Sequence, residues 1–369
     1  MKNNHDYNKY KSRYLTIKNN LNRIHPLTID VYNDTFYIVK ELGKGFRGIV
    51  YLAKNADGVH VALKIEKLLP HDVKKSLMSF YWREIEFATT MNRLYPDQFM
   101  KLYKYDIKKE CPAQINDHIK EVLKLRSTDA QKGFLKLLNS PFCSIKAWSL
   151  VDLTLKELFN QWSFDNFKPD VFYDLFIQIV HTIHLINKHG YYHRDFHTKN
   201  IGLVKTKENF IDVLGSKILT HGYHIIPLDY GKVINWKYPL RPQEKEDLEN
   251  ENDLMILFRH TLINFDKFNL LNGITQDDHY GAKIKIPDDI RNELAGYLTN
   301  LKVNENIQYK CIKVLYKMLY YEDYERQLMG GKLKVIEAPL LLIPENAIVY
   351  LISNFKDPEK VLRYLLDNR

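Results

Sequence analysis

The sequence has few cysteines and no segment of the signal-peptide type. Only three cysteines occur among 369 residues, Cys111, Cys143 and Cys311, and they stand far apart without paired spacing. This argues against a disulfide framework or a zinc knuckle and favours a reducing compartment. The N-terminal stretch MKNNHDYNKYKSRYLTIKNN is charged and has no apolar core, so we expect no signal peptide and an intracellular, cytoplasmic location.

Long hydrophobic runs, internal repeats and low-complexity tracts are also missing. The most apolar C-terminal run, residues 338–352, is interrupted by a Pro-Glu-Asn triplet and falls short of the roughly 20 residues that a membrane span needs, which predicts buried core. A hydrophobic content of 45% is enough for a large core, and the length of 369 residues suggests two domains or lobes. The formal charge of +9 favours acidic partners such as proteins, nucleotides or nucleic acid without identifying one.

The order of the predicted elements indicates an α+β fold with a small strand-rich front and a larger helical back. A polar, basic extension covers residues 1–30. The pattern then predicts strands at 36–42, 48–54 and 59–68, a helix at 76–94, a strand at 101–105, a Lys-rich helical insertion at 106–140 and a strand at 142–150. Residues 151–369 are mostly helical. We interpret residues 31–150 and 151–369 as two lobes of one unit.

The stretch LGKGFRGIV places glycines at Gly43, Gly45 and Gly48. It leads into a β-branched strand, not a helix, which excludes a dinucleotide-binding fingerprint, and it lacks the Gly-Lys-Ser/Thr ending of a P-loop. A β-hairpin whose backbone N–H groups approach phosphate oxygens fits the pattern. A plain glycine hairpin is the alternative reading.

Two charged residues follow this turn at a suggestive spacing. Lys64 lies on the next predicted strand, where alternation directs it to the face that the glycine turn covers. Glu84 lies on the helix that follows, and a Lys–Glu pair would hold the ammonium extended toward nucleotide phosphates. Glu86 competes for this role, and we favour Glu84 because the apolar residues after it then face the core.

The stretch YYHRDFHTKN contains an acid and an amide five positions apart. Asp195 could accept the proton of an attacking hydroxyl, and Asn200 could offer its amide oxygen to a hard cation such as Mg²⁺. Downstream, Asp229 ends an apolar strand ahead of an aromatic residue and Gly231, and is a second oxygen ligand. Two metal ligands and a lysine would neutralise the charge on a transferring phosphoryl group.

Taken together, five motifs in this order resemble those of the eukaryotic-type protein kinases: G-x-G-x-x-G-x-V, V-A-L-K, R-E-I-E, H-R-D-(x)4-N and D-Y-G. The resemblance implies a bilobal fold, Asp195 as catalytic base with Lys64 and Glu84, and Asn200 and Asp229 as magnesium ligands. It also implies an ATP-binding set consisting of Leu42, Gly43, Lys44, Gly45, Phe46, Arg47, Gly48, Val50, Ala62 and Lys64.

The chain departs from the kinase pattern in the middle of this loop. His197 stands where the usual Ser/Thr kinases carry a lysine that reaches the γ-phosphate. Haspin-like kinases and small-molecule phosphotransferases resembling aminoglycoside kinases also carry a histidine at this place. Lys199 could supply the missing charge and is our fourth catalytic candidate. A zinc site at His193 and His197 is a rival reading, weakened by the loop setting and the lack of a nearby cysteine or third ligand.

Further departures follow the loop. Tyr230 replaces the usual Phe, as in the vaccinia-related kinases, and Gly202 stands where a Leu normally lies beneath the adenine. The segment after Asp229 is short, lacks Ala-Pro-Glu and has Tyr238 as its only hydroxyl residue before Asp253, which argues against control by phosphorylation. The acidic run at residues 244–251 favours a solvated loop, or else a contact for a basic substrate. Asp253 itself resembles the buried acid that tethers the catalytic-loop backbone.

The predicted activity is transfer of the γ-phosphoryl group of ATP, with Mg²⁺, to Ser or Thr hydroxyls of a protein. The alternatives are a small-molecule kinase of the aminoglycoside or choline kinase type and a nucleotide-binding pseudokinase scaffold. The second alternative is weakened because Lys64, Asp195, Asn200 and Asp229 are all present. The Lys-, Asn-, Ile- and Tyr-rich usage and the insertions resemble kinases of large DNA viruses, which would act in the cytoplasm of a host cell.

Overall fold

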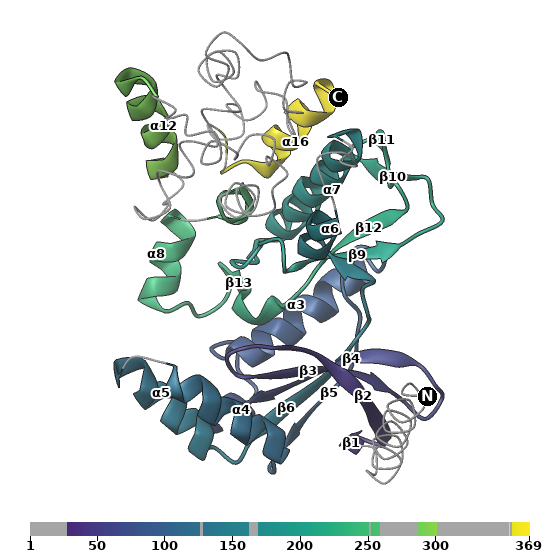
Figure 1. Cartoon of the computed structure of the whole chain (residues 1–369), viewed down its shortest axis with the longest axis vertical. Helices are drawn as coiled ribbons and strands as arrows, with labels where there is room; N and C mark the ends of the chain where they lie inside the picture. Colours follow the sequence, from purple (N-terminus) through teal and green to yellow (C-terminus); the bar gives the residue numbers. More distant parts are fainter. Residues whose placement is uncertain are drawn as a thin grey trace, which may run out of the picture. The chain divides into compact units, whose positions relative to one another are not determined.

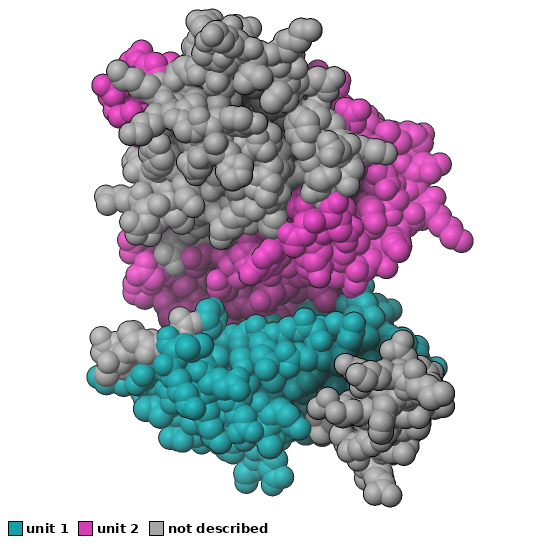
Figure 2. Space-filling model, in the orientation of Figure 1, with its two compact units in different colours: residues 1–74, 101–150 teal, residues 75–100, 151–369 magenta. Residues whose placement is uncertain are grey.

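The computed structural model describes residues 28–125, 128–161, 169–250, 252–258, 286–300, 354 and 356–369. The protein is a mixed α+β chain, as predicted, and it divides into two compact units (Figure 2). Unit 1 comprises residues 1–74 and 101–150, and unit 2 comprises residues 75–100 and 151–369. Most of the predicted N-terminal extension and the apolar run 338–352 lie outside the described residues.

One antiparallel sheet forms the body of unit 1, with the strand order β1-β2-β3-β4-β6-β5 (Figure 1). Its strands are β1 (Thr28–Val31), β2 (Asp34–Lys44), β3 (Gly48–Lys54), β4 (His60–Lys67), β5 (Leu102–Lys108) and β6 (Cys143–Trp148). The predicted three-strand meander is β2-β3-β4. Its second turn closes because the Asn55 side chain accepts a hydrogen bond from the Val59 N–H at 2.8 Å and Gly58 adopts a φ of +87°.

The insertion between β5 and β6 is helical, as its apolar spacing predicts. It forms α4 (Ala113–Lys124) and α5 (Thr128–Asn139). Ile115 of α4 is fully buried in the same core as Val61, Leu63 and Ile65 of β4, so α4 covers the core face of the sheet. The short helix α2 (Pro70–Val73) follows β4.

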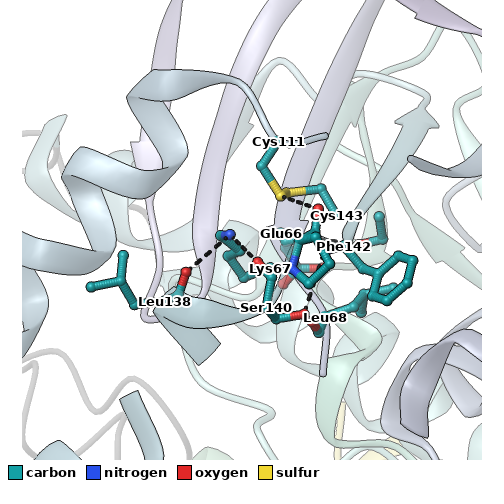
Figure 3. The surroundings of a disulfide bond; sticks show 10 residues. Glu66, Lys67, Leu68, Cys111, Leu138, Ser140, Phe142 and Cys143 are labelled. Atoms are coloured by element: carbon teal, nitrogen blue, oxygen red, sulfur yellow. Dashed lines mark hydrogen bonds between the residues drawn. A yellow bond between two sulfur atoms is a disulfide. The ribbon is translucent and has the colours of Figure 1, made fainter. Parts of the chain in front are cut away.

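Covalent and polar contacts hold both ends of the insertion to the sheet (Figure 3). Cys111, just before α4, forms a disulfide with Cys143 at the start of β6. At the other end, the Lys67 ammonium donates to the carbonyls of Leu138 at 3.3 Å and Ser140 at 2.5 Å. The prediction of unpaired cysteines is therefore wrong for this pair, and cysteine usage no longer supports a reducing compartment.

The pairing of β5 with β6 explains the disulfide. Lys108 and Cys143 are register partners, and Cys111 follows Lys108 by three residues along the chain. The Cα atoms of the two cysteines are 5.4 Å apart, within the usual range for a disulfide. Strand pairing thus brings together two cysteines that are 32 positions apart in the sequence, and their spacing alone does not reveal this proximity.

Unit 2 contains most of the helices. They are α3 (Phe80–Leu94), α6 (Leu155–Gln161), α7 (Pro169–Lys188), α8 (Pro242–Asn250), α12 (Asp288–Asn300) and α16 (Pro358–Asp367). The long apolar helix α7 is buried, and Gly190 with a φ of +76° follows its end. Helix α16 packs on α7, where the Tyr173 hydroxyl donates to the Leu365 carbonyl at 3.0 Å.

Short strands carry the loops of unit 2. They are β7 (Leu153–Thr154), β8 (Tyr191–Tyr192), β9 (Ile201–Lys205), β10 (Phe210–Val213), β11 (Ser216–Leu219), β12 (Tyr223–Pro227) and β13 (Ile234–Asn235). β12, β9 and β7 form one sheet, and β13 pairs with β8. Between β9 and β12 the chain forms the β10–β11 hairpin.

Helix α3, which the sequence pattern assigned to the N-terminal lobe, groups with unit 2. Its residues Phe87, Ala88 and Met91 are fully buried. Within the described ranges, no helix has the length and apolar character needed to cross a bilayer.

Candidate active site

The sheet of unit 1 has one apolar face and one face that carries charge. Val61, Leu63 and Ile65 of β4 belong to the buried core. Strand alternation therefore turns Ala62 and Lys64 to the opposite face, where Val50 lies across from Lys64 in the β3–β4 ladder. Three residues predicted to bind nucleotide thus share one face of the sheet.

The glycine-rich turn connects β2 to β3 and is closed by a hydrogen bond from the Gly45 N–H to the Gly48 carbonyl at 2.9 Å. A Cβ at Gly48 would lie 1.9 Å from the Ile65 carbonyl oxygen, so packing between β3 and β4 requires glycine there. A Cβ at Gly43 would meet no neighbouring atom of the described residues within 4 Å, so local packing does not explain that glycine. The other predicted turn residues, Leu42, Lys44, Phe46 and Arg47, are exposed.

Helix α4 contacts this turn directly. The His118 Nε2 atom lies 2.6 Å from the Gly45 carbonyl oxygen, and since a carbonyl only accepts, Nε2 carries the proton. The His118 side chain is buried, and its Nδ1 atom has no hydrogen-bond partner among the described residues. The insertion therefore fixes the conformation of the glycine-rich turn, a role that its sequence did not indicate.

A cluster of three charged side chains, of which Lys146 is buried and Lys64 and Glu66 are partly buried, lies on the charged face of the sheet. Glu66 accepts from the Lys146 ammonium at 2.6 Å and pairs with Lys64 at 3.2 Å. Lys64 and Lys146 are register partners on β4 and β6, and Lys146 is fully buried. Sequence reasoning missed Glu66 and Lys146, although a lone lysine in the apolar run FCSIKAWSL was a usable signal.

On helix α3, Glu84 is buried, and Glu86, the alternative partner for Lys64, is hydrogen-bonded. The Glu86 carboxylate accepts hydrogen bonds from the hydroxyls of Tyr191, at 2.7 Å, and Tyr238. Burial, followed by the hydrogen bond to Glu86, raises the pKa of Tyr191 to about 12, so this phenol stays protonated. These contacts give Glu86 a role within unit 2. Pairing of Glu84 with Lys64 stays a prediction.

The backbone of the YYHRDFHTKN loop is held by one buried carboxylate. Asp253 accepts from the His193 N–H at 2.8 Å and from the Arg194 N–H at 2.7 Å, so the predicted tether is present. Arg194 has a φ of +63°, a conformation that costs a non-glycine residue roughly 1 kcal/mol or more and needs such support. Burial raises the pKa of Asp253, while the two N–H donors and nearby positive charges oppose that shift.

Three side chains surround the Asp195 carboxylate. The Asn200 amide donates to the Asp195 carbonyl at 3.0 Å and to its Oδ2 at 3.3 Å. The Lys232 ammonium lies 2.8 Å from Asp195 Oδ1, and His197 Nε2 lies 3.9 Å from the same oxygen. Burial lowers the pKa of His197 below 6.5, against the attraction of Asp195, so the neutral imidazole is favoured at pH 7.

The D-Y-G turn lies beside this loop. The Leu228 N–H donates to the Asn200 carbonyl at 2.8 Å, which brings the residue before Asp229 against the loop. Asp229 has a φ of +57°, another strained position. Tyr230 is fully buried against Phe87, with ring centroids 4.7 Å apart, and its hydroxyl accepts from the Met100 N–H at 3.0 Å.

The predicted metal ligands fit Mg²⁺ by their chemistry. Because the Asn200 amide nitrogen is committed to Asp195, its side-chain oxygen remains as the acceptor, and Asp229 adds a carboxylate. No group of three or more His, Cys, Asp or Glu side chains that could hold a metal occurs in the described part of the chain. Mg²⁺ bound at nucleotide phosphates does not need such a group of side chains, since its ligands are one or two protein oxygens together with phosphates and waters.

The remaining loop residues are placed as follows. Lys199 is exposed, and its predicted role beside the phosphate stays a prediction. His193 Nε2 lies 2.9 Å from the Leu228 carbonyl oxygen, a hydrogen bond that commits this nitrogen and weakens the zinc reading. A Cβ at Gly202 would lie 2.7 Å from Val151 Cγ1 and 3.0 Å from Leu228 Cδ2. The side chains of Val151 and Leu228 therefore occupy the space that a larger residue at position 202 would need.

The acidic run after the D-Y-G turn is helical as far as it is described, and Glu244 is buried, which corrects the prediction of a solvated loop. It forms helix α8, and Glu244 near its start pairs with Arg83 of α3 at 2.7 Å. Arg83 is fully buried and also donates to the carbonyls of Leu77 and Pro239. Burial alone would raise the pKa of Glu244, but hydrogen bonds from Arg83 and Arg241 lower it to about 2.

No known protein family and no curated protein matches this chain. The kinase family therefore stays a prediction from the five motifs. Any function must be argued from the residues and their contacts.

Proposed function

We propose that the chain is an ATP-dependent protein kinase that phosphorylates Ser or Thr hydroxyls of a protein substrate. The observation that carries the proposal is the arrangement at Asp195. Its carboxylate is oriented by Asn200 five positions on, its loop is tethered by Asp253, and the D-Y-G turn is hydrogen-bonded to the same loop. A charged surface turn does not require any of these three supports.

In the proposed reaction the substrate hydroxyl oxygen bonds to the γ-phosphorus while the bond from that phosphorus to the bridging oxygen breaks, and ADP leaves. Asp195 accepts the hydroxyl proton. Asn200 and Asp229 would hold Mg²⁺, which supplies charge neutralisation to the phosphates. Lys64, which Glu66 orients at 3.2 Å, would contact the nonreacting phosphates.

In the nucleotide-binding role, the glycine-rich turn presents backbone N–H groups to phosphate oxygens, and the hydrogen bond from His118 to Gly45 orders the turn before binding. Val50 and Ala62, on the same face as Lys64, would pack on the adenine. Lys146 was not singled out from the sequence. Its buried ammonium shares Glu66 with Lys64 and adds positive charge on this face.

The test is transfer of radiolabel from ATP with Mg²⁺ to a mixture of acidic and basic proteins, compared between wild type and Asp195→Asn. Loss of a general base lowers turnover by about 10²- to 10⁴-fold, while the ATP affinity should change little. Asp367→Asn, an exposed carboxylate on α16, is the matched control and should keep full activity.

Two outcomes contradict the proposal. If the wild type binds no ATP and labels no protein, including itself, the enzyme interpretation fails. If label passes to amino or hydroxyl groups of aminoglycosides or choline but to no protein, the chain is a small-molecule kinase.

A further inference from the structure

Lys232 follows the D-Y-G turn and lies at the proposed base. Its ammonium is 2.8 Å from Asp195 Oδ1, the oxygen that the Asn200 amide does not use. No sequence motif indicated this residue, because it lies 37 positions from Asp195. The contact matters because His197 stands where a lysine was expected in the loop.

The backbone that carries Lys232 is fixed on both sides. Lys232 ends the short 3-10 helix η1 (Tyr230–Lys232), which begins at a fully buried tyrosine. The Val233 N–H donates to the Tyr230 carbonyl at 3.1 Å, and Ile234 then pairs with Tyr192 between β13 and β8. The side chain therefore starts from a defined position, and its charge is directed at the carboxylate.

Two other basic residues of the loop, His197 and Lys199, are placed less favourably. His197 Nε2 is 3.9 Å from the same carboxylate oxygen, beyond hydrogen-bond distance. Lys199 projects from an exposed position and has no ion pair with Asp195 among the contacts of the described residues. Of the three, Lys232 is the group in direct contact with the proposed base.

Stability does not explain the Lys232–Asp195 pair. The Lys232 side chain is 62% exposed, and exposed ion pairs contribute a median of about 0–1 kcal/mol because water screens them and the long side chain must be ordered. An exposed ammonium on a fixed backbone, beside a carboxylate that accepts a proton, is instead well placed to meet an anionic substrate.

We propose that Lys232 is a catalytic residue that contacts the transferring phosphoryl group and supplies positive charge beside Asp195. This assignment rests on the proposed kinase function. The lysine acts through its charge. Its ammonium stabilises the negative charge on the phosphoryl oxygens while Asp195 takes the hydroxyl proton, so it takes part in no bond to phosphorus.

The first experiment compares Lys232→Met, Lys232→Arg and wild type, with Lys237→Met as matched control. Lys237 is an exposed lysine on the same segment. Lys232→Met should lower kcat by about tenfold or more, since loss of one electrostatic donor in an active site commonly costs about 10²-fold or more. Lys232→Arg should restore most of kcat, and the control should match wild type.

A binding measurement separates this role from a structural one. If Lys232 contacts the γ-phosphoryl group, Lys232→Met should weaken ATP binding about 3- to 10-fold while ADP binding is unchanged, as for the loss of one charge-assisted contact. Isothermal titration calorimetry with ATP and with ADP, each with Mg²⁺, measures the ratio. Equal weakening of both nucleotides would overturn the assignment.

Other results also decide it. An unchanged or raised kcat in Lys232→Met would show that the ammonium is neutral to catalysis or blocks the base, and a larger loss in Lys199→Ala than in Lys232→Met would transfer the role to Lys199. In all these cases the wild type still binds ATP and transfers phosphate, so only the Lys232 assignment fails. A wild type that binds no nucleotide refutes the kinase proposal together with this one.

Discussion

The buried ion pair between Arg83 and Glu244 makes a strong prediction about the stability of unit 2. Arg83 is fully buried, and Glu244 lies 2.7 Å away with 4% of its side chain exposed. Replacing Arg83 with methionine keeps a long apolar stem but leaves the carboxylate buried with only Arg241, whose side chain is 53% exposed. We expect the free energy of unfolding to fall by about 3–5 kcal/mol, as for other broken buried pairs.

The pH dependence of this effect has a definite sign. The pKa of Glu244 is about 2 in the folded protein and 4.5 as its ordinary value. A lowered pKa contributes stability that is fully present above pH 4.5 and is lost as the pH falls toward 2. The pKa difference of 2.5 (4.5 − 2) corresponds to at most about 3 kcal/mol. The difference in the free energy of unfolding between wild type and Arg83→Met should therefore become smaller as the pH falls below 4.5.

Urea unfolding followed by circular dichroism, at pH 7 and at steps below pH 4.5, measures both quantities. Arg363→Met is the control, because Arg363 forms an exposed i,i+4 pair with Glu359 that water screens, so its loss should change the free energy of unfolding little. The double variant Arg83→Met with Glu244→Met should be more stable than Arg83→Met alone. The reasoning is refuted if Arg83→Met costs no more than the control, or if the two substitutions simply add.

Two further predictions concern unit 1. Cys111→Ser should lower the free energy of unfolding by about 2–4 kcal/mol and should leave the buried Cys143 as a thiol that is alkylated once the unreduced protein is unfolded; equal stability and no additional thiol alkylated in the unfolded, unreduced protein would show that the disulfide does not form. His118→Ala should weaken ATP binding about 3- to 10-fold, because the Gly45 carbonyl loses its buried donor, whereas the exposed control Lys120→Ala should leave the affinity unchanged; an unaltered affinity in His118→Ala would mean that α4 does not order the turn.

Local periodicity was enough to predict the framework of unit 1. Alternation in β4 placed Lys64 opposite the core residues around it, and the ladder confirms that face. The glycine-rich turn was also predictable, since backbone conformation at such a site depends on a few adjacent residues. The tether at Asp253 was anticipated through the kinase resemblance.

The missed contacts have a common cause. Lys146 meets Glu66 across 80 positions and Arg83 meets Glu244 across 161. Such pairs depend on how strands and helices are brought together, and a charged residue carries the same letter whether it is solvated or buried. Neither a lone lysine in an apolar strand nor an acidic run discloses its partner.

The attachment of α3 to the segment after Asp229 has a consequence for whether a covalent modification could control the order of that segment. The groups that make it, Arg83 with Glu244 and Glu86 with two tyrosines, are present as soon as the chain folds. Tyr238, the only hydroxyl residue between Gly231 and Asp253, is buried with its hydroxyl on Glu86, so a phosphorylating enzyme finds no accessible hydroxyl there. The contacts that hold the described part of this segment therefore form with the fold itself, and phosphorylation of Tyr238 is not available as a step that would order it.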